Sequence, residues 1–261
     1  VLEIWELLKE YNFTSSDEEN NNEENNTINP NILGYIFEKS IGDYRKATGA
    51  YYTRSKITNY ISRNTLNRFF LDNINKKFQT VLPWPLDTFQ QLKMYPIELR
   101  TKIYKYFIKL LEKLKICDPA VGSGAFLVSI GELIVRIYNF LINIIGLESI
   151  PYKSTEEIEG DKRRFKDLYE LKTFIVQNNL YGVDINPSAV EICELRLWLW
   201  IVQPPPNLDT IDIKLEPLPN IEYNIRVGNS LFGYTSGIRE IESFDKTAGE
   251  KVKFAMISEW A

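Results

Sequence analysis

Three short polar segments, each placed directly after a strand-like run, contain the residues of this chain that could bind a small charged ligand. The first covers residues 118–126 (DPAVGSGAF), where an acid precedes two glycines. Gly122 and Gly124 allow the backbone to approach a ligand closely, and a helix that begins after them offers free N–H groups to an anion. Asp118 adds a carboxylate at the same place, which suits a ligand that also has a cationic part.

The second and third segments each supply one polar side chain. Asp184 follows the run 179–183 and is placed to accept hydrogen bonds from a ribose diol. Asn229 follows the run 225–227, and its amide can pair with the edge of a purine. Because ligands of doubly wound sheets bind beyond the carboxyl ends of the strands, we expect the three segments to meet at one edge of a sheet.

The spacing of these segments separates the possible cofactors. A dinucleotide site needs a third glycine and an acid about 20 residues beyond the turn, whereas Asp184 lies 62 residues beyond Gly122. A Walker-type phosphate loop needs a lysine, which residues 122–124 lack. S-adenosylmethionine fits an acid, a Gly-x-Gly turn, a ribose-binding acid and an adenine-binding amide. An isolated Gly-x-Gly pair is a helix-packing turn about as often as it is a ligand-binding turn. Here the pair is followed by two further polar strand ends in the expected order, which favours a ligand site.

Apolar periodicity predicts the elements that position these residues. Predicted strands lie at 114–117, 179–183 and 225–227, and predicted helices at 126–144 and 187–202. Asn186 is a suitable N-cap for the second helix, with Pro187 in its first turn. This order of elements is the first half of a doubly wound sheet. The predicted fold class is therefore α/β, with a mostly helical region at 1–112 followed by the first half of a Rossmann-like sheet at 113–261.

The first 112 residues are predicted to be mostly helical. Helical spacing of apolar residues occurs at 3–11, at 31–41, at 55–71 and after Pro96. The Asn/Glu-rich tract 15–29 has almost no apolar side chain and is predicted to be a surface loop, and the proline-broken segment 82–96 to be a connector. The helix after Pro96 carries four lysines opposite its apolar stripe, at positions 102, 105, 109 and 113.

Composition narrows the possible function classes. The chain of 261 residues is 44% hydrophobic and 25% charged, as is ordinary for a soluble globular protein, and it contains no histidine. Ser-His-Asp and Cys-His catalysis and His-ligated zinc are therefore excluded within it. Cys117 and Cys193 lie in apolar runs, which predicts reduced, buried thiols in an intracellular protein. The apolar stretch 129–147 contains Glu132 and Arg136, so we do not expect it to span a membrane.

Charge is distributed unevenly along the chain. Residues 38–115 carry 16 basic and 6 acidic side chains, a net charge of +10, whereas residues 1–37 and 116–261 each carry a net charge of −7. A basic block between acidic flanks is compatible with a surface that contacts nucleic acid. No signal peptide opens the chain, and its start at Val1 suggests the boundary of a fragment.

Taken together, the motifs resemble those of amino-methylating DNA methyltransferases. Residues 118–126 resemble the first cofactor motif in its adenine-specific form, 181–187 (YGVDINP) the second, and 228–231 (GNSL) the third. Residues 48–53 (TGAYYT) resemble the preceding motif of the gamma-order group, which closes over the methionine end of the cofactor. Most of the chain is also similar to type IIG restriction–modification enzymes, which fuse an endonuclease, a helical connector, a methyltransferase and a target-recognition domain. That further similarity lies at 11–14, at Pro30, at 33–38 and at 218–220.

The resemblance implies that the cofactor is S-adenosylmethionine. The residues that it assigns to the cofactor are Thr48, Gly49, Tyr52, Thr53, Asp118, Pro119, Ala120, Gly122, Ser123, Gly124, Phe126, Asp184, Ile185, Asn229 and Ser230. It implies methyl transfer to the N6 amine of adenine, in a cytoplasmic restriction–modification or phage-defence enzyme. The implied partners are double-stranded DNA and the rest of the same polypeptide, and no metal or membrane is implied.

Two departures from the family qualify this resemblance. Arg54 stands where the family usually has a proline. The catalytic tetrapeptide of the family, Asn or Asp followed by two prolines and an aromatic residue, is absent, and residues 203–206 (QPPP) are interpreted as a helix stop. No catalytic residue is therefore assigned, and we expect that this chain alone does not methylate DNA. No nuclease core is apparent in the sequence either.

Two other functions stay open on the sequence alone. One is a non-catalytic subunit that binds cofactor or DNA while a partner performs the reaction. The other is a nicotinamide oxidoreductase, which the 62-residue spacing disfavours. The side chains of Arg196, Trp198 and Trp200 in the predicted helix 187–202 are interpreted as packing and surface-capping groups rather than site residues.

Overall fold

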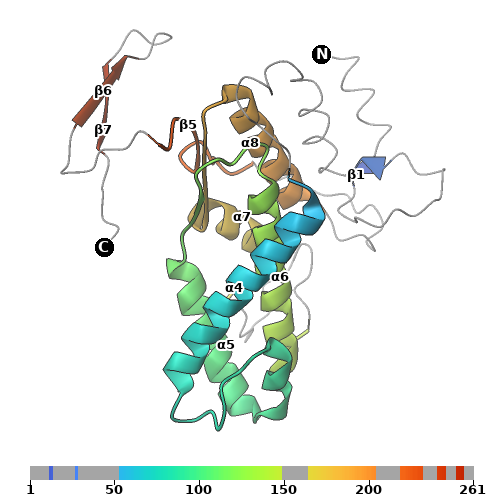
Figure 1. Cartoon of the computed structure of the whole chain (residues 1–261). Helices are drawn as coiled ribbons and strands as arrows, with labels where there is room; N and C mark the ends of the chain where they lie inside the picture. Colours follow the sequence, from blue (N-terminus) through green and yellow to red (C-terminus); the bar gives the residue numbers. More distant parts are fainter. Residues whose placement is uncertain are drawn as a thin grey trace. The chain divides into compact units, whose positions relative to one another are not determined.

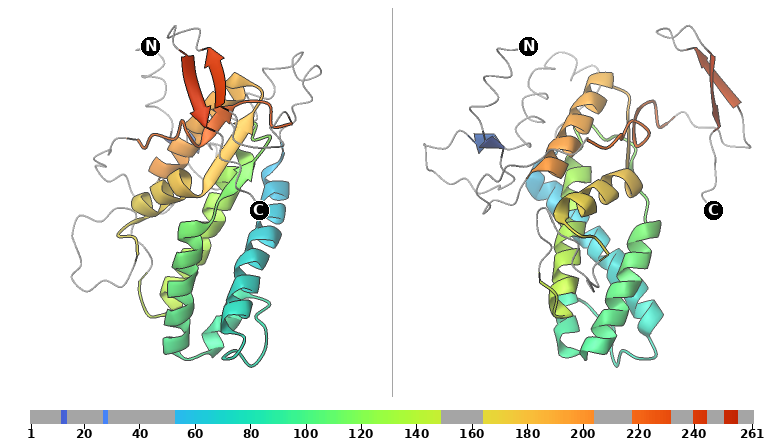
Figure 2. Two further views of the ribbon diagram at one scale, coloured as in Figure 1. Left: turned by 90° about the vertical axis from the view of Figure 1, so that its left-hand side faces the viewer. Right: turned by 180° about the vertical axis from the view of Figure 1, so that it is seen from behind.

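A parallel sheet of three short strands carries the predicted motifs. The computed structural model describes residues 53–148, 164–203 and 218–231, together with the backbone of short strands at 12–13, 27–28, 240–244 and 251–255. The strands are β3 (Ile116–Asp118), β4 (Leu180–Asp184) and β5 (Ile225–Val227), in the order β3-β4-β5. The arrows of β3 and β4 lie side by side in Figure 2 (left), and all pairs are parallel. The predicted α/β fold class is confirmed.

Three helices connect and cover these strands, namely α6 (Ala125–Ile144), α7 (Leu168–Asn178) and α8 (Pro187–Val202). The predicted start of α8 is confirmed, because the Asn186 side chain accepts a hydrogen bond from the Ser188 N–H at 3.0 Å and Pro187 is the first helical residue. Helix α7 was not predicted from the sequence. Its N-cap is Asp167, whose carboxylate accepts a hydrogen bond from the Glu170 N–H at 2.8 Å.

The helical region consists of α4 (Ser55–Phe78), the short 3-10 helix η1 (Phe89–Met94) and α5 (Ile97–Lys113). Helices α4, α5 and α6 pack along one another (Figure 1). Helix α4 extends seven residues past the predicted end at residue 71. The loop that follows α4 is anchored by Asn75, whose side chain makes two hydrogen bonds with the backbone of Leu86, at 2.7 and 2.9 Å. The predicted lysine face of α5 is confirmed as exposed at positions 102, 105, 109 and 113.

Helix α6 is the centre of the hydrophobic core. It contacts α4, α5, α7, α8 and β4, and its residues Leu127, Ile134 and Leu141 are fully buried. In the described part of the chain, α6 is the one helix that is long and apolar enough to cross a membrane. However, 56% of its most apolar stretch is buried inside the protein. A core helix passes the same length and composition test, so this finding agrees with the expectation that the segment does not span a membrane.

The chain divides into two units, Val1–Gly228 and Asn229–Ala261, which we describe separately. In the second unit β6 (Glu240–Phe244) pairs antiparallel with β7 (Lys251–Ala255). In the first unit β1 (Asn12–Phe13) pairs parallel with β2 (Thr27–Ile28), which lies inside the tract predicted to be a loop. The predicted helices at 3–11 and 31–41 lie outside the described residues.

Candidate functional site

The turn after β3 is held against β4 by backbone hydrogen bonds. Val121 N–H donates to the Val183 carbonyl at 2.9 Å, and one carboxylate oxygen of Asp118 accepts from the Ala120 N–H at 3.0 Å. Gly122 has φ +53° and Gly124, the N-cap of α6, has φ +81°. Both values lie in the left-handed region that favours glycine. Glycine at both positions therefore lets the turn adopt this conformation without backbone strain.

The two glycines of this turn differ in their surroundings. A Cβ atom on Gly124 would lie 2.7 Å from the sulfur of Cys193 in α8, so no side chain fits there. A Cβ atom on Gly122 would have no neighbour within 4 Å and would face open space. Gly124 thus allows α6 and α8 to pack closely, whereas Gly122 leaves its backbone accessible to a ligand.

Asp184, at the end of β4, connects the first two predicted segments. Its Oδ2 accepts a hydrogen bond from the Gly122 N–H at 2.8 Å, and its Oδ1 accepts one from the Asn186 N–H at 2.9 Å. The Asp184 carbonyl accepts a further hydrogen bond from the Gly228 N–H at 2.8 Å. A carboxylate has about four acceptor positions, so these bonds leave capacity for a ligand. The ends of β3, β4 and β5 therefore meet at one edge, as expected from the sequence.

The carboxyl group of Asp118 lies in an electrostatic environment that suits a cationic ligand. Burial raises the pKa of Asp118 above its ordinary value, the Ala120 N–H opposes this shift, and the negative charge of Asp184 adds to it. A cation placed beside Asp118 would stabilise the ionised form and lower the pKa again. Burial and the neighbouring carboxylate thus favour a positive ligand at this end of the turn.

Arg196 of α8 contacts the turn after β3, and this contact was not predicted from the sequence. It is completely buried, and its Nη1 donates to the Ser123 carbonyl at 2.8 Å and to the Ser123 hydroxyl at 3.0 Å. The interpretation of Arg196 as a surface-capping group is therefore wrong. Trp198 and Trp200 do have structural contacts, with the Pro219 carbonyl and with Gly131 respectively. The available signal was a basic residue within the apolar run 195–202 that ends this helix.

The two cysteines differ from each other in exposure. Cys193 is buried as predicted, and burial raises the pKa of its thiol to about 12. The prediction that Cys117 is buried is wrong, because this residue is exposed. Side chains alternate along a strand, so Cys117 points to the opposite face from Ile116 and Asp118, which are both half-buried. Among the described strands, β3 also lies at the edge of the sheet.

The remaining predicted residues lie at or outside this edge as follows. Thr48, Gly49 and Tyr52 lie outside the described residues, and Thr53 is half-buried just before α4. Pro119 and Ala120 are exposed, Phe126 is half-buried, and Ile185 is 59% exposed. Asn229 and Ser230 are exposed and belong to the second unit, where the Asn229 side chain accepts a hydrogen bond from the Leu231 N–H at 3.0 Å. The structure thus brings together the first two motifs and the end of β5.

Comparisons with known proteins agree with these motifs. Residues 178–257 match the family described as Eco57I restriction-modification methylase. A type II restriction enzyme and methyltransferase of Methanocaldococcus jannaschii is 37% identical over 245 residues, which cover 89% of this chain and 19% of that protein.

Two further relatives are more distant. A type II restriction enzyme and methyltransferase of Escherichia coli is 26% identical over 50% of this chain and 12% of its own length. DNA methyltransferase A of Bacillus subtilis is 26% identical over 66% of this chain and 16% of its own length. The chain therefore spans less than a fifth of the length of each of these curated relatives. The resemblance predicted from the motifs is confirmed: over most of its length, this chain is similar to type IIG restriction–modification methyltransferases.

Proposed function

We propose that this chain is the cofactor-binding portion of a site-specific DNA methyltransferase of a restriction–modification or phage-defence system. The reaction is methyl transfer from S-adenosylmethionine to the N6 amine of adenine in DNA. The names of the relatives support a DNA methyltransferase. The motifs at 48–53, 118–126, 181–187 and 228–231 support the gamma order and the choice of adenine.

The observation that carries the cofactor proposal is the hydrogen bond from Gly122 N–H to Asp184 Oδ2. It places an open, side-chain-free backbone between two carboxylates at the carboxyl ends of parallel strands. A ligand with a cationic amino-acid end and a ribose fits this arrangement, and S-adenosylmethionine has both. When bound, it supplies an electrophilic methyl group on a sulfonium.

Each group of this chain has a proposed task toward that cofactor. Asp118 accepts hydrogen bonds from the methionine ammonium, and the open space at Gly122 lets the amino-acid end approach the turn. Asp184 accepts hydrogen bonds from the ribose hydroxyls, and the exposed side chain of Ile185 offers apolar surface to the adenine ring. Asn229 pairs with the adenine edge. The loop containing Thr48, Gly49, Tyr52 and Thr53 closes over the methionine end.

The chain is proposed to work as part of a larger polypeptide. Its relatives are more than five times as long as the part matched here, which supports further domains in the same chain. We propose a helical connector region at 1–112 and a partial cofactor-binding domain at 113–261, with duplex DNA as partner and the cytoplasm as location. The alternative is a module that binds cofactor or DNA without catalysing transfer, which the absence of an Asn/Asp-Pro-Pro-aromatic sequence among the 261 residues favours.

Calorimetric titration of S-adenosylmethionine into the 261-residue chain tests the cofactor assignment. Asp118→Asn and Asp184→Ala should each weaken binding by about tenfold to a hundredfold, because a charge-assisted hydrogen bond is removed. Asp72→Asn, an exposed acid of α4 outside the site, is the control and should leave the affinity unchanged. Affinity that is unaltered in both site variants would refute the assignment. Labelled methyl groups should not reach adenine-containing duplex DNA with this chain alone, and turnover would contradict our expectation that catalytic residues lie elsewhere.

A further inference from the structure

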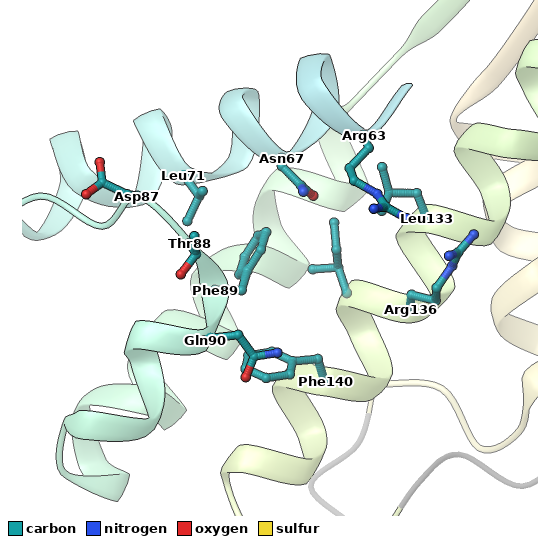
Figure 3. Close-up of a pocket in the computed structure, with 11 residues that line it drawn as sticks. Arg63, Asn67, Leu71, Asp87, Thr88, Phe89, Gln90, Leu133, Arg136 and Phe140 are labelled. Atoms are coloured by element: carbon teal, nitrogen blue, oxygen red, sulfur yellow. The ribbon is translucent and has the colours of Figure 1, made fainter. Parts of the chain in front are cut away.

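A second concave site lies in the helical region, between α4, the start of η1 and α6. Its volume is about 320 Å³, which is at the lower end of the range for small-ligand sites. Figure 3 shows Arg63 and Arg136 at one end of this hollow, Asp87 at the other end, and Phe89 between them. None of the motifs assigned to the cofactor contributes to it.

The arginine end of the hollow favours an anion. Arg63 comes from α4 and Arg136 from α6, and both are exposed. Arg136 forms an ion pair with Glu132 one helical turn away, at 3.4 Å, with 56% of the arginine side chain exposed. An exposed pair of this kind contributes little and can exchange for a better partner. Each guanidinium group carries a planar set of N–H donors that can bind two phosphate oxygens at once, and two such groups lie at this end of the cavity.

The middle of the hollow favours a flat ring that carries hydrogen-bond donors. The rings of Phe89 and Phe140 form an edge-to-face pair with centroids 6.5 Å apart, and both residues line the cavity. The exposed Asp87 carboxylate at the far end of the hollow can accept hydrogen bonds from such donors.

We infer that this hollow binds one nucleotide unit, with its phosphate between Arg63 and Arg136 and its base against Phe89 and Phe140. An anionic end, a flat ring and exocyclic N–H groups are the three features of a nucleoside phosphate, and they match the arginines, the aromatic pair and the Asp87 carboxylate in that order. The nucleotide is either a unit of a DNA strand or a free mononucleotide. This inference extends the proposed function, in which the chain acts on DNA, but it does not depend on cofactor binding.

The test compares three probes on the 261-residue chain, namely adenosine monophosphate, a 5′-phosphorylated single-stranded tetranucleotide of deoxyadenosine, and inorganic phosphate. The variant Arg63→Gln combined with Arg136→Gln should weaken binding of both nucleotide probes by roughly tenfold or more. Arg68→Gln is the matched control, because Arg68 lies on the same helix, is 79% exposed and is outside the hollow. It should change the affinity less than about twofold, as expected for an exposed charge.

A second pair of variants tests the base. Phe89→Leu should weaken nucleotide binding by about fivefold to a hundredfold, as expected when a stacked base is deprived of its aromatic partner. Phe69→Leu, on the exposed side of α4 and outside the hollow, is its control. Tighter binding of the tetranucleotide than of the mononucleotide would identify a DNA strand as the source, and the reverse order a free nucleotide.

Three results would overturn the inference. The first is equal affinities of the double arginine variant and Arg68→Gln. The second is competition by inorganic phosphate as strong as that by the mononucleotide, and the third is absence of nucleotide binding by the unaltered chain. The double arginine variant should keep its affinity for S-adenosylmethionine. A chain that bound nucleotides here but no S-adenosylmethionine would contradict the proposed function and leave this inference intact.

Discussion

The two glycines of the turn after β3 should respond in opposite ways to the same substitution. Gly124→Ala places a methyl group 2.7 Å from the Cys193 sulfur, whereas Gly122→Ala places one in open space. We therefore expect the first variant to lose folding stability, and the second to lose affinity for S-adenosylmethionine while keeping most of its stability. The two variants therefore distinguish the packing role of Gly124 from the ligand-binding role of Gly122.

The magnitudes follow from the backbone and the distance between the two side chains. An L-residue in the left-handed region costs about 1–2 kcal/mol, and this cost applies to both positions. Overpacking against Cys193 adds about 1–3 kcal/mol at position 124 alone. For a chain of this size each kcal/mol lowers Tm by about 2–4 °C, so Gly124→Ala should melt roughly 4–20 °C lower. Gly122→Ala should melt only about 2–8 °C lower.

Urea and thermal unfolding followed by circular dichroism measure the change in stability, and calorimetry measures the affinity. The double variant Gly124→Ala with Cys193→Ala should recover about 1–3 kcal/mol relative to the sum of the single variants, because the colliding sulfur is gone. Cys193→Ala alone provides the reference for its own cavity. Equal destabilisation at positions 122 and 124, or no recovery in the double variant, would refute the reasoning.

Three further perturbations test other parts of the structure. Arg196→Met should release the turn after β3 and weaken S-adenosylmethionine binding at least about tenfold, and calorimetry that finds no change would contradict its positioning role. Burial lowers the pKa of Lys172 to about 7, so the unfolded chain, with a lysine pKa of about 10.4, binds more protons between these values. The free energy of unfolding should therefore rise with pH from about 7 to 10, by up to about 1.4 kcal/mol per pH unit. Urea melts over this pH range that show the same dependence for Lys172→Met as for the unaltered chain would refute this. The third perturbation replaces Lys105, Lys109 and Lys113 of α5 by glutamine. A plot of log affinity for duplex DNA against log salt concentration should become shallower by about 0.9 for each phosphate that the chain no longer neutralises. An unaltered slope would show that this face contacts only solvent.

Local signals explain why the sequence predicted most of the described elements. The start of α8 is determined by Asn186 and Pro187, and the strands are short apolar runs that end at polar residues. Helix α7 was missed because its N-cap, Asp167, lies within the charged segment 148–170, whose composition hides the cap. The end of α4 was placed too early because its last turns contain asparagine and lysine, which propensity alone does not assign to a buried helix.

Sequence signals likewise predicted the parts of the site that depend on the order of elements, and missed its contacts between distant residues. The rule that ligands bind at strand carboxyl ends correctly placed Asp118 and Asp184 at one edge, since it depends only on the order of elements. The bond from Gly122 to Asp184 joins residues 62 positions apart, and the bond from Arg196 to Ser123 joins residues 73 positions apart. No periodicity or spacing rule connects such pairs, because the first depends on the pairing of β3 with β4 and the second on how α8 packs against the turn after β3.

These two long-range bonds have a consequence for the proposed cofactor. The carboxylate of Asp184 holds the turn by a backbone N–H, and the guanidinium of Arg196 holds it by the carbonyl and hydroxyl of the next residue. Opposite charges therefore fix adjacent peptide groups before a ligand arrives, and binding does not have to supply the entropy of ordering the turn. The charge that a ligand can still stabilise is that of Asp118, because burial raises its pKa and a cation would reverse that shift. A preformed turn with one destabilised carboxylate favours the cationic methionine end of S-adenosylmethionine over a neutral or anionic ligand of similar shape.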